Sequence, residues 1–289
     1  MKKIFIITAV ALSFAARGQH LPGFSTTSVF QKNCGSFNAE LLNNWHNEFL
    51  DHVFYGVQEL QLCMNSASFY NGVNALSRQF LQDKGIILSE AFLFDNDIET
   101  YIREISDIDL CKLKAGALAS EIICRLKKLM KDYSDDQLMA DEFEERVEEL
   151  LSKAEAVENQ IEKIAVKSAL VIAAGSTRYW EAMAIKYNER LSAICKAGAA
   201  GRASISGFAN RSASPFIYTG FNVGSVKADF NPPGKEIIGR MVVSDAVGAF
   251  QGAVFGGLGG GPIGAFAGAI LGAGARSVMR GLFYGFTGL

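Results

Sequence analysis

Residues 246–275 read AVGAFQGAVFGGLGGGPIGAFAGAILGAGA, thirty residues without an ionisable side chain, bounded by Asp245 and Arg276. Glycine recurs at every fourth position: Gly248, Gly252, Gly256, Gly260, Gly264, Gly268 and Gly272. Such a row leaves one helix face without side chains, so another backbone can approach it closely, as in helix pairs within lipid. In water each glycine costs a helix about 0.5–1 kcal/mol relative to alanine. The repeat therefore predicts a closely packed, membrane-associated helical segment.

A turn near the middle of this segment favours a helical hairpin over residues 236–289. The turn is Leu258-Gly259-Gly260-Gly261-Pro262, and proline seldom continues a helix. The second arm is short unless it continues through Arg276 and Arg280, which must then face a partner, water or the membrane interface. Three alternatives remain open: a single tilted span, a low-complexity tail in water, and a hairpin buried in the core of the same protein.

The segment from residue 244 to the C-terminus resembles the glycine-zipper membrane segments of envelope proteins, channels and small membrane-active bacterial peptides. The resemblance implies association with membrane lipid and with other copies of the chain, giving a homo-oligomer through the glycine row. A helical bundle joined to an apolar hairpin also looks like the layout of α-helical pore-forming toxins, although no motif is shared.

The chain before the hairpin is rich in helical periodicity, which predicts a helical bundle over residues 38–200. Apolar residues share one face from Leu41 to Leu60, and further helices are expected over 67–82, 97–105 and from 107 to about 130. A heptad pattern then predicts one long helix, with seam residues Phe143, Val147, Leu150, Ala154, Val157, Ile161, Ile164, Ser168 and Val171. A basic helix over 177–196 is expected to pack antiparallel against this acidic one. The fold class is mainly α, an elongated helical bundle with a long heptad helix.

The N-terminus has the features of a cleaved secretory signal over residues 1–18. Lys2 and Lys3 precede an uncharged apolar run, and Ala16 and Gly18 place small residues at the cleavage site. The signal predicts an exported protein of the periplasm, outer envelope or medium. Residues 19–37 form a short N-terminal segment, and 201–235 form a linker rich in glycine, serine and aromatic residues. The basic residues that flank the hairpin would keep both of its ends in the cytoplasm, which conflicts with a secretory signal. The conflict is resolved if the weakly hydrophobic hairpin does not stop translocation, so we expect the whole chain to be exported before the hairpin inserts from outside.

Export would place the cysteines where disulfides persist. The candidates are Cys34, Cys63, Cys111, Cys124 and Cys195, an odd number that leaves at least one thiol unpaired. If Cys111 and Cys124 share one helix, thirteen residues separate them by about 20 Å, which predicts that they do not pair with each other.

Composition argues against several functional classes. A net charge of -2 gives no basic footprint for nucleic acid. The sequence Gly259-Gly260-Gly261-Pro262-Ile263-Gly264 matches GxGxxG, but no strand precedes it and no acid follows it. His46 and His52 have no metal-ligand spacing, so neither metal, cofactor nor catalytic activity is expected.

The sequence therefore predicts an exported, membrane-associated envelope protein that anchors or self-associates through its C-terminal hairpin. Two alternatives are a membrane-permeabilising, bacteriocin-like effector and a soluble exported protein with a buried hairpin.

Overall fold

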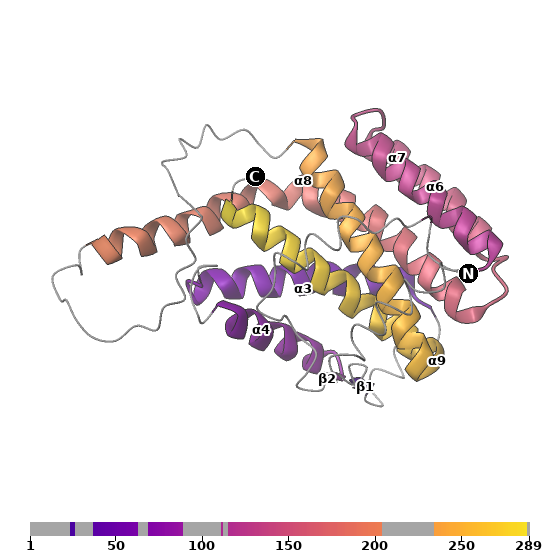
Figure 1. Ribbon diagram of the computed structural model, residues 1–289, viewed down its shortest axis with the longest axis horizontal. Helices are drawn as coiled ribbons and strands as arrows, with labels where there is room; N and C mark the ends of the chain where they lie inside the picture. Colours follow the sequence, from indigo (N-terminus) through magenta and orange to yellow (C-terminus); the bar gives the residue numbers. More distant parts are fainter. Residues whose placement is uncertain are drawn as a thin grey trace, which may run out of the picture.

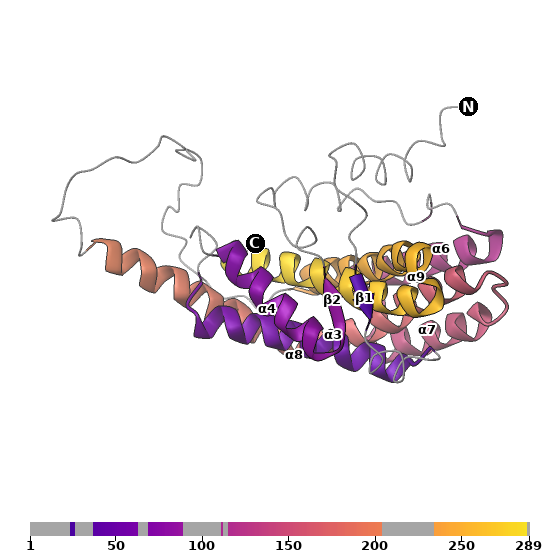
Figure 2. The same ribbon diagram turned by 90° about the horizontal axis from the view of Figure 1, so that it is seen from below.

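The computed structural model describes residues 24–26, 37–62, 69–88, 111, 115–203 and 234–287. Within them the chain is mainly α-helical, as the sequence predicts (Figures 1 and 2). The elements are β1 (Phe24–Thr26), α3 (Ala39–Glu59), α4 (Phe69–Asp83), β2 (Ile86–Leu88), α6 (Ala117–Ser134), α7 (Ala140–Ala154), α8 (Gln160–Ala203) and α9 (Lys235–Thr287). The predicted signal peptide, the expected helix over 97–105 and nearly all of the expected linker lie outside the described residues.

The first helix, α3, follows the apolar pattern of its sequence. Asn38 caps it, since its side-chain oxygen accepts a hydrogen bond from the Leu41 amide at 2.9 Å. Its apolar face, which includes Trp45, Phe49 and Val53, is buried. α4 packs against α3, and β2 pairs antiparallel with β1, placing Phe24 opposite Leu88. The sequence pattern does not predict this two-stranded sheet.

The heptad pattern over 143–171 does not form the single helix that the sequence predicts. The structure has two helices here, α7 and α8, separated by residues 155–159. The break has a local cause, because the Asn159 side chain accepts hydrogen bonds from the amides of Ile161 and Glu162 at 3.0 and 3.1 Å. Asn159 therefore starts a new helix, as an N-cap residue does. The seam residues on both sides of the break, such as Phe143 and Ile164, are nevertheless buried.

The predicted long helix is found later in the chain, as α8, which has 44 residues. It joins the second half of the heptad seam to the basic segment 177–196, which the sequence pattern treats as a separate helix. The expected attraction between acidic and basic segments occurs between α7 and α8, where Arg178 pairs with Glu144 and Asp141. Figure 1 shows the C-terminal part of α8 extending past the other helices.

The C-terminal helix α9 folds back on itself as a hairpin, as predicted. It packs against α8, α3 and α6 (Figure 2). One hydrophobic core includes side chains of both α9 arms together with those of α3, α6, α7 and α8. The predicted segments 38–200 and 236–289 thus follow each other along the chain but share a single core.

Candidate functional site

The two arms of α9 meet through their glycine faces. A Cβ atom added at each of these glycines would collide with the backbone of the opposite arm, and the matched pairs are Gly248 with Gly272, Gly252 with Gly268, and Gly256 with Gly264. Six of the seven predicted glycines therefore lie at one interface within the chain. The absence of side chains there allows the two backbones to come into direct contact.

The seventh glycine, Gly260, lies at the turn, where nothing stands within 4 Å of an added Cβ. Gly261 reverses the chain with a φ of 60°, a conformation that residues with a side chain rarely adopt, and Pro262 follows it. The predicted turn is thus in place. The glycine repeat serves close packing on both sides of this turn and leaves the turn itself open.

The outer faces of the hairpin are covered by the rest of the protein. Gly274 lies against the ring of Phe49, and Gly281 lies against Phe54 and Trp180. The two arms, Lys235–Leu258 and Gly260–Leu282, are each long and apolar enough to cross a membrane. However, 67% of the most apolar stretch of the first arm and 78% of that of the second are buried inside the protein. In this conformation the hairpin is a core element of the bundle.

A buried polar cluster ties the open end of the hairpin to the bundle. We call it the latch cluster, and it comprises Asp245 and Ser277 from the two arms, Trp180 from α8 and His46 from α3, all fully buried. The Trp180 indole donates to Asp245 Oδ2 at 2.8 Å, and the Ser277 hydroxyl donates to Asp245 Oδ1. His46 Nε2 lies 3.0 Å from Ser277 Oγ and 3.7 Å from Asp245 Oδ2. The acid inside the apolar arm is therefore satisfied by groups of the same chain.

Each ring nitrogen of His46 lies beside an oxygen atom. The Ser277 hydroxyl donates its hydrogen bond to Asp245, so Ser277 Oγ can accept one from His46 Nε2 at 3.0 Å. His46 Nδ1 lies 3.1 Å from the Asn47 side-chain oxygen. Burial lowers the pKa of His46 below its usual value, and attraction to Asp245 and the hydrogen bond to Asn47 oppose that shift. Burial is the largest of these effects on the pKa.

The latch cluster contains the residue types of a hydrolytic triad but not its arrangement. In a triad, histidine takes the proton of serine and is oriented by the acid through its other nitrogen. Here the Ser277 hydroxyl donates its hydrogen bond to Asp245 instead of to His46, and His46 Nδ1 faces Asn47. All three triad-type side chains are fully buried. The arrangement connects three helices and suits structural coupling rather than attack on a substrate.

The arginines of the second arm also face the protein. Arg276 donates to the Gln251 side chain at 2.5 Å, and Arg280 donates to the Arg240 backbone carbonyl at 3.0 Å. The second arm therefore continues beyond residue 275, and its cations are bound to the first arm, one of the arrangements expected from the sequence.

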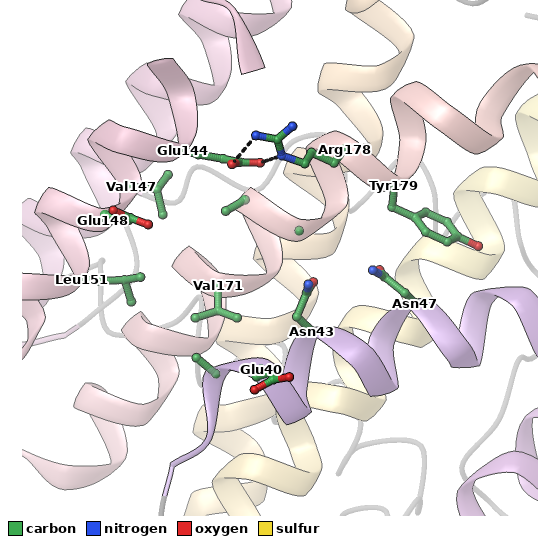
Figure 3. A pocket seen from close by; sticks show the side chains of 13 residues that line it. Glu40, Asn43, Asn47, Glu144, Val147, Glu148, Leu151, Val171, Arg178 and Tyr179 are labelled. Carbon is green, nitrogen blue, oxygen red and sulfur yellow. Dashed lines mark hydrogen bonds and ion pairs between the residues drawn. The ribbon is translucent and has the colours of Figure 1, made fainter. Parts of the chain in front are cut away.

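An open groove of about 620 Å³ lies between α3, α7 and α8 (Figure 3). Its walls carry Glu40, Glu144 and Glu148 together with Val171. Arg178 at its rim is held by Glu144 at 2.8 Å and by Asp141 at 2.7 Å. Among the described residues, no group of three or more His, Cys, Asp or Glu side chains is placed to hold a metal ion.

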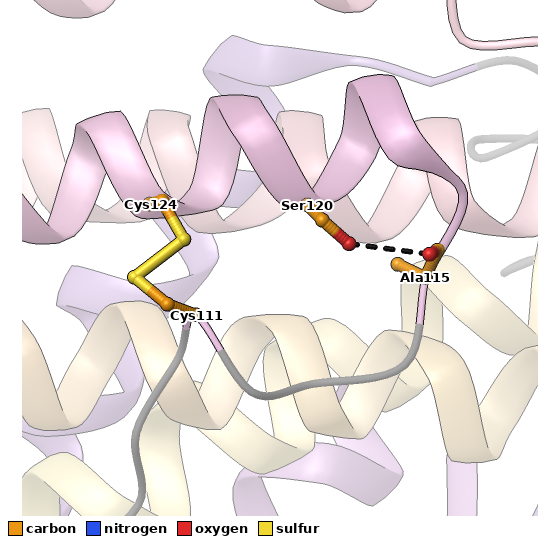
Figure 4. The surroundings of a disulfide bond; sticks show 4 residues. All are labelled: Cys111, Ala115, Ser120 and Cys124. Atoms are coloured by element: carbon orange, nitrogen blue, oxygen red, sulfur yellow. Dashed lines mark hydrogen bonds between the residues drawn. A yellow bond between two sulfur atoms is a disulfide. The ribbon is translucent and has the colours of Figure 1, made fainter.

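The prediction that Cys111 and Cys124 cannot pair is wrong, because they form a disulfide with their Cα atoms 4.9 Å apart (Figure 4). The prediction assumed one helix through both residues. In the structure α6 begins only at Ala117, after Gly116. Cys111 therefore lies before the helix, and the helical rise does not set its distance from Cys124. Cys34 and Cys63 lie outside the described residues, and Cys195 lies on α8.

The sequence pattern indicated no partner for His46 and marked Asp245 only as the residue that bounds the apolar run. One signal for the latch cluster was present: Asp245 is the single acid within the apolar part of the first arm, and a buried acid requires partners. The most distant of those partners, His46, lies on α3, far from Asp245 along the chain. No protein-family model, no curated protein and no solved structure matches this chain.

Proposed function

We propose that this is an exported effector that folds in water around its apolar hairpin and then inserts that hairpin into a lipid bilayer, permeabilising it. The observation that carries the proposal is the division of contacts in α9. The arms contact each other through glycine backbone, while the bundle covers their outer, apolar faces.

This division makes the hairpin transferable as a unit. Contacts between the glycine faces involve only the two arms, so they persist if the hairpin leaves the bundle. The outer faces exchange protein side chains for lipid tails, which are similarly apolar. Insertion therefore replaces contacts with α3, α6 and α8 without breaking those within the hairpin.

The same division of contacts limits how copies of the chain could form the expected homo-oligomer. The glycine face is already occupied by the other arm, so contact between copies through this face requires the arms to separate. A hairpin that serves as a permanent anchor would also gain nothing from burying 67–78% of its most apolar stretches against its own bundle. We therefore favour conditional insertion over the envelope-anchor function.

The test uses the intact protein with vesicles of equimolar phosphatidylcholine and phosphatidylglycerol, measuring co-flotation and dye release. Val254→Glu adds a charge at a partly exposed position of the first arm, and Ile185→Glu adds the same charge on α8. An acid in a membrane span costs about 2.5–3.5 kcal/mol. We expect wild type and Ile185→Glu to float and release dye, and Val254→Glu to lose at least about tenfold in both.

Absence of flotation by wild type would refute the proposal, as would equal losses in the two variants. Flotation without dye release would reject permeabilisation and return the hairpin to the role of an anchor. Circular dichroism of both variants in water establishes that they fold before vesicles are added.

A further inference from the structure

The turn of the hairpin, residues 258–263, carries the most exposed large apolar side chain of the described residues. Leu258 is 72% exposed, and Gly260 and Pro262 are exposed beside it. From Gly252 to Ala275 the chain has no polar side chain at all. Glycine and proline are ordinary turn residues. The feature that turn geometry does not explain is the exposed Leu258, which has no polar side chain beside it in the turn.

We propose that this turn is the surface through which the protein first enters a lipid bilayer, an inference that rests on the proposed function. The hairpin has a free end and a tied end. The latch cluster holds Asp245 and Ser277 at the open end of the two arms, whereas Gly260 and Gly261 at the turn have no atom within 4 Å of an added Cβ. In Figure 1 the turn lies beside the α9 label, where the two arms of α9 meet.

The depth that the turn can reach follows from the helix rise. Gln251, the nearest polar residue of the first arm, is seven positions before Leu258 and about 10 Å along the helix. Arg276 of the second arm is fourteen positions after Pro262, about 21 Å away. Apolar segments of peripheral proteins enter the headgroup and acyl boundary to about 5–10 Å. The turn can thus enter this zone before any polar side chain of α9 loses water.

Lipid fits this surface better than a protein partner does. A stable protein interface buries about 800 Å² on each partner and uses directional polar groups. Three glycines, Pro262, Leu258 and the half-buried Ile263 supply neither the area nor the hydrogen-bonding side chains. A bilayer needs no such complementarity, but it excludes charged groups. A charged residue near the turn is Glu162, which follows the Ile161 that contacts Gly257. Its carboxylate already accepts a hydrogen bond from the Gly116 amide at 3.1 Å.

The chain offers a matched control for the test. Leu60, at the end of α3, is 57% exposed and lies between Glu59 and Gln61. We compare Leu258→Glu with Leu60→Glu for flotation with equimolar phosphatidylcholine and phosphatidylglycerol vesicles. We expect about a tenfold smaller bound fraction for Leu258→Glu and no change for Leu60→Glu.

A second measurement reports the position of the turn directly. In Leu258→Trp, tryptophan emission shifts to the blue on vesicle addition and is quenched by brominated lipid, while Leu60→Trp shows neither change. Difference spectra remove the contributions of the buried Trp45 and Trp180. If wild type floats and Val254→Glu does not, but Leu258→Glu floats like wild type, the turn is not the entry surface and the proposed function stands. If wild type itself does not float, both fail.

Discussion

Replacing Gly268 by alanine tests the contact between the two glycine faces. A Cβ at this position would stand 2.8 Å from the carbonyl carbon of Gly252 and closer still to its oxygen, where ordinary van der Waals contact begins at 3.4 Å. The carbon contact alone requires the arms to separate by about 0.6 Å, and the closer oxygen contact requires more than that. A gap of 0.5–1 Å forfeits roughly a quarter to a half of the dispersion energy of the atoms involved.

Two opposing contributions decide whether Gly268→Ala raises or lowers the free energy of unfolding. Forcing a methyl group into a packed interior typically costs about 1–3 kcal/mol. Alanine in a helix gains about 0.5–1 kcal/mol over glycine. We expect Gly268→Ala to lower the free energy of unfolding by about 1–2 kcal/mol, which corresponds to roughly 2–8 °C in Tm for a protein of this size.

Gly260→Ala is the control, because it makes the same chemical change where an added Cβ meets nothing within 4 Å. Helix propensity alone predicts that this variant is unchanged or up to about 1 kcal/mol more stable. Urea denaturation followed by circular dichroism at 222 nm measures both variants. Equal stability of Gly268→Ala and Gly260→Ala would refute the direct contact of the glycine faces.

Two further predictions concern the latch cluster. Trp180→Phe removes the indole donor that lies 2.8 Å from Asp245 Oδ2, and loss of this partner from a buried acceptor should cost about 1–3 kcal/mol in urea denaturation; a cost no larger than that of Trp45→Phe would contradict this role. Because burial lowers the pKa of His46, the unfolded chain takes up the proton first as the pH falls below about 6.5, so wild type should lose stability relative to His46→Gln between pH 7 and 5. The slope of that difference is at most about 1.4 kcal/mol per pH unit, and parallel stability curves for the two proteins would exclude a neutral, buried His46.

Local features of this fold were readable from the sequence where one segment determines its own structure. The apolar stripe through Trp45, Phe49 and Val53 predicted the buried face of α3, and Gly261-Pro262 predicted the turn of the hairpin. The break before α8 also had a local signal that the heptad pattern obscured, since Asn159 followed by Glu162 is typical of a helix start.

What covers the hairpin was not readable, because lipid and a protein core select the same apolar and small residues. The decisive contacts, such as Gly274 with Phe49 and His46 with Ser277, join segments more than two hundred residues apart. The pairing of Cys111 with Cys124 depended on where α6 begins, and helix boundaries are poorly defined by periodicity alone.

The glycine contacts of the hairpin are placed symmetrically about Gly260, with Gly256 facing Gly264 and Gly248 facing Gly272. Sliding one arm past the other by a single helical repeat of four residues would again place glycine opposite glycine. The repeat therefore dictates how near the arms come but leaves their alignment degenerate. Alignment is decided by features that do not repeat: the short turn at Gly261 and the unique pairing of Asp245 with Ser277. If the Asp245–Ser277 hydrogen bond were lost, the short turn and the bond between Arg276 and Gln251 would still hold the arms in this alignment.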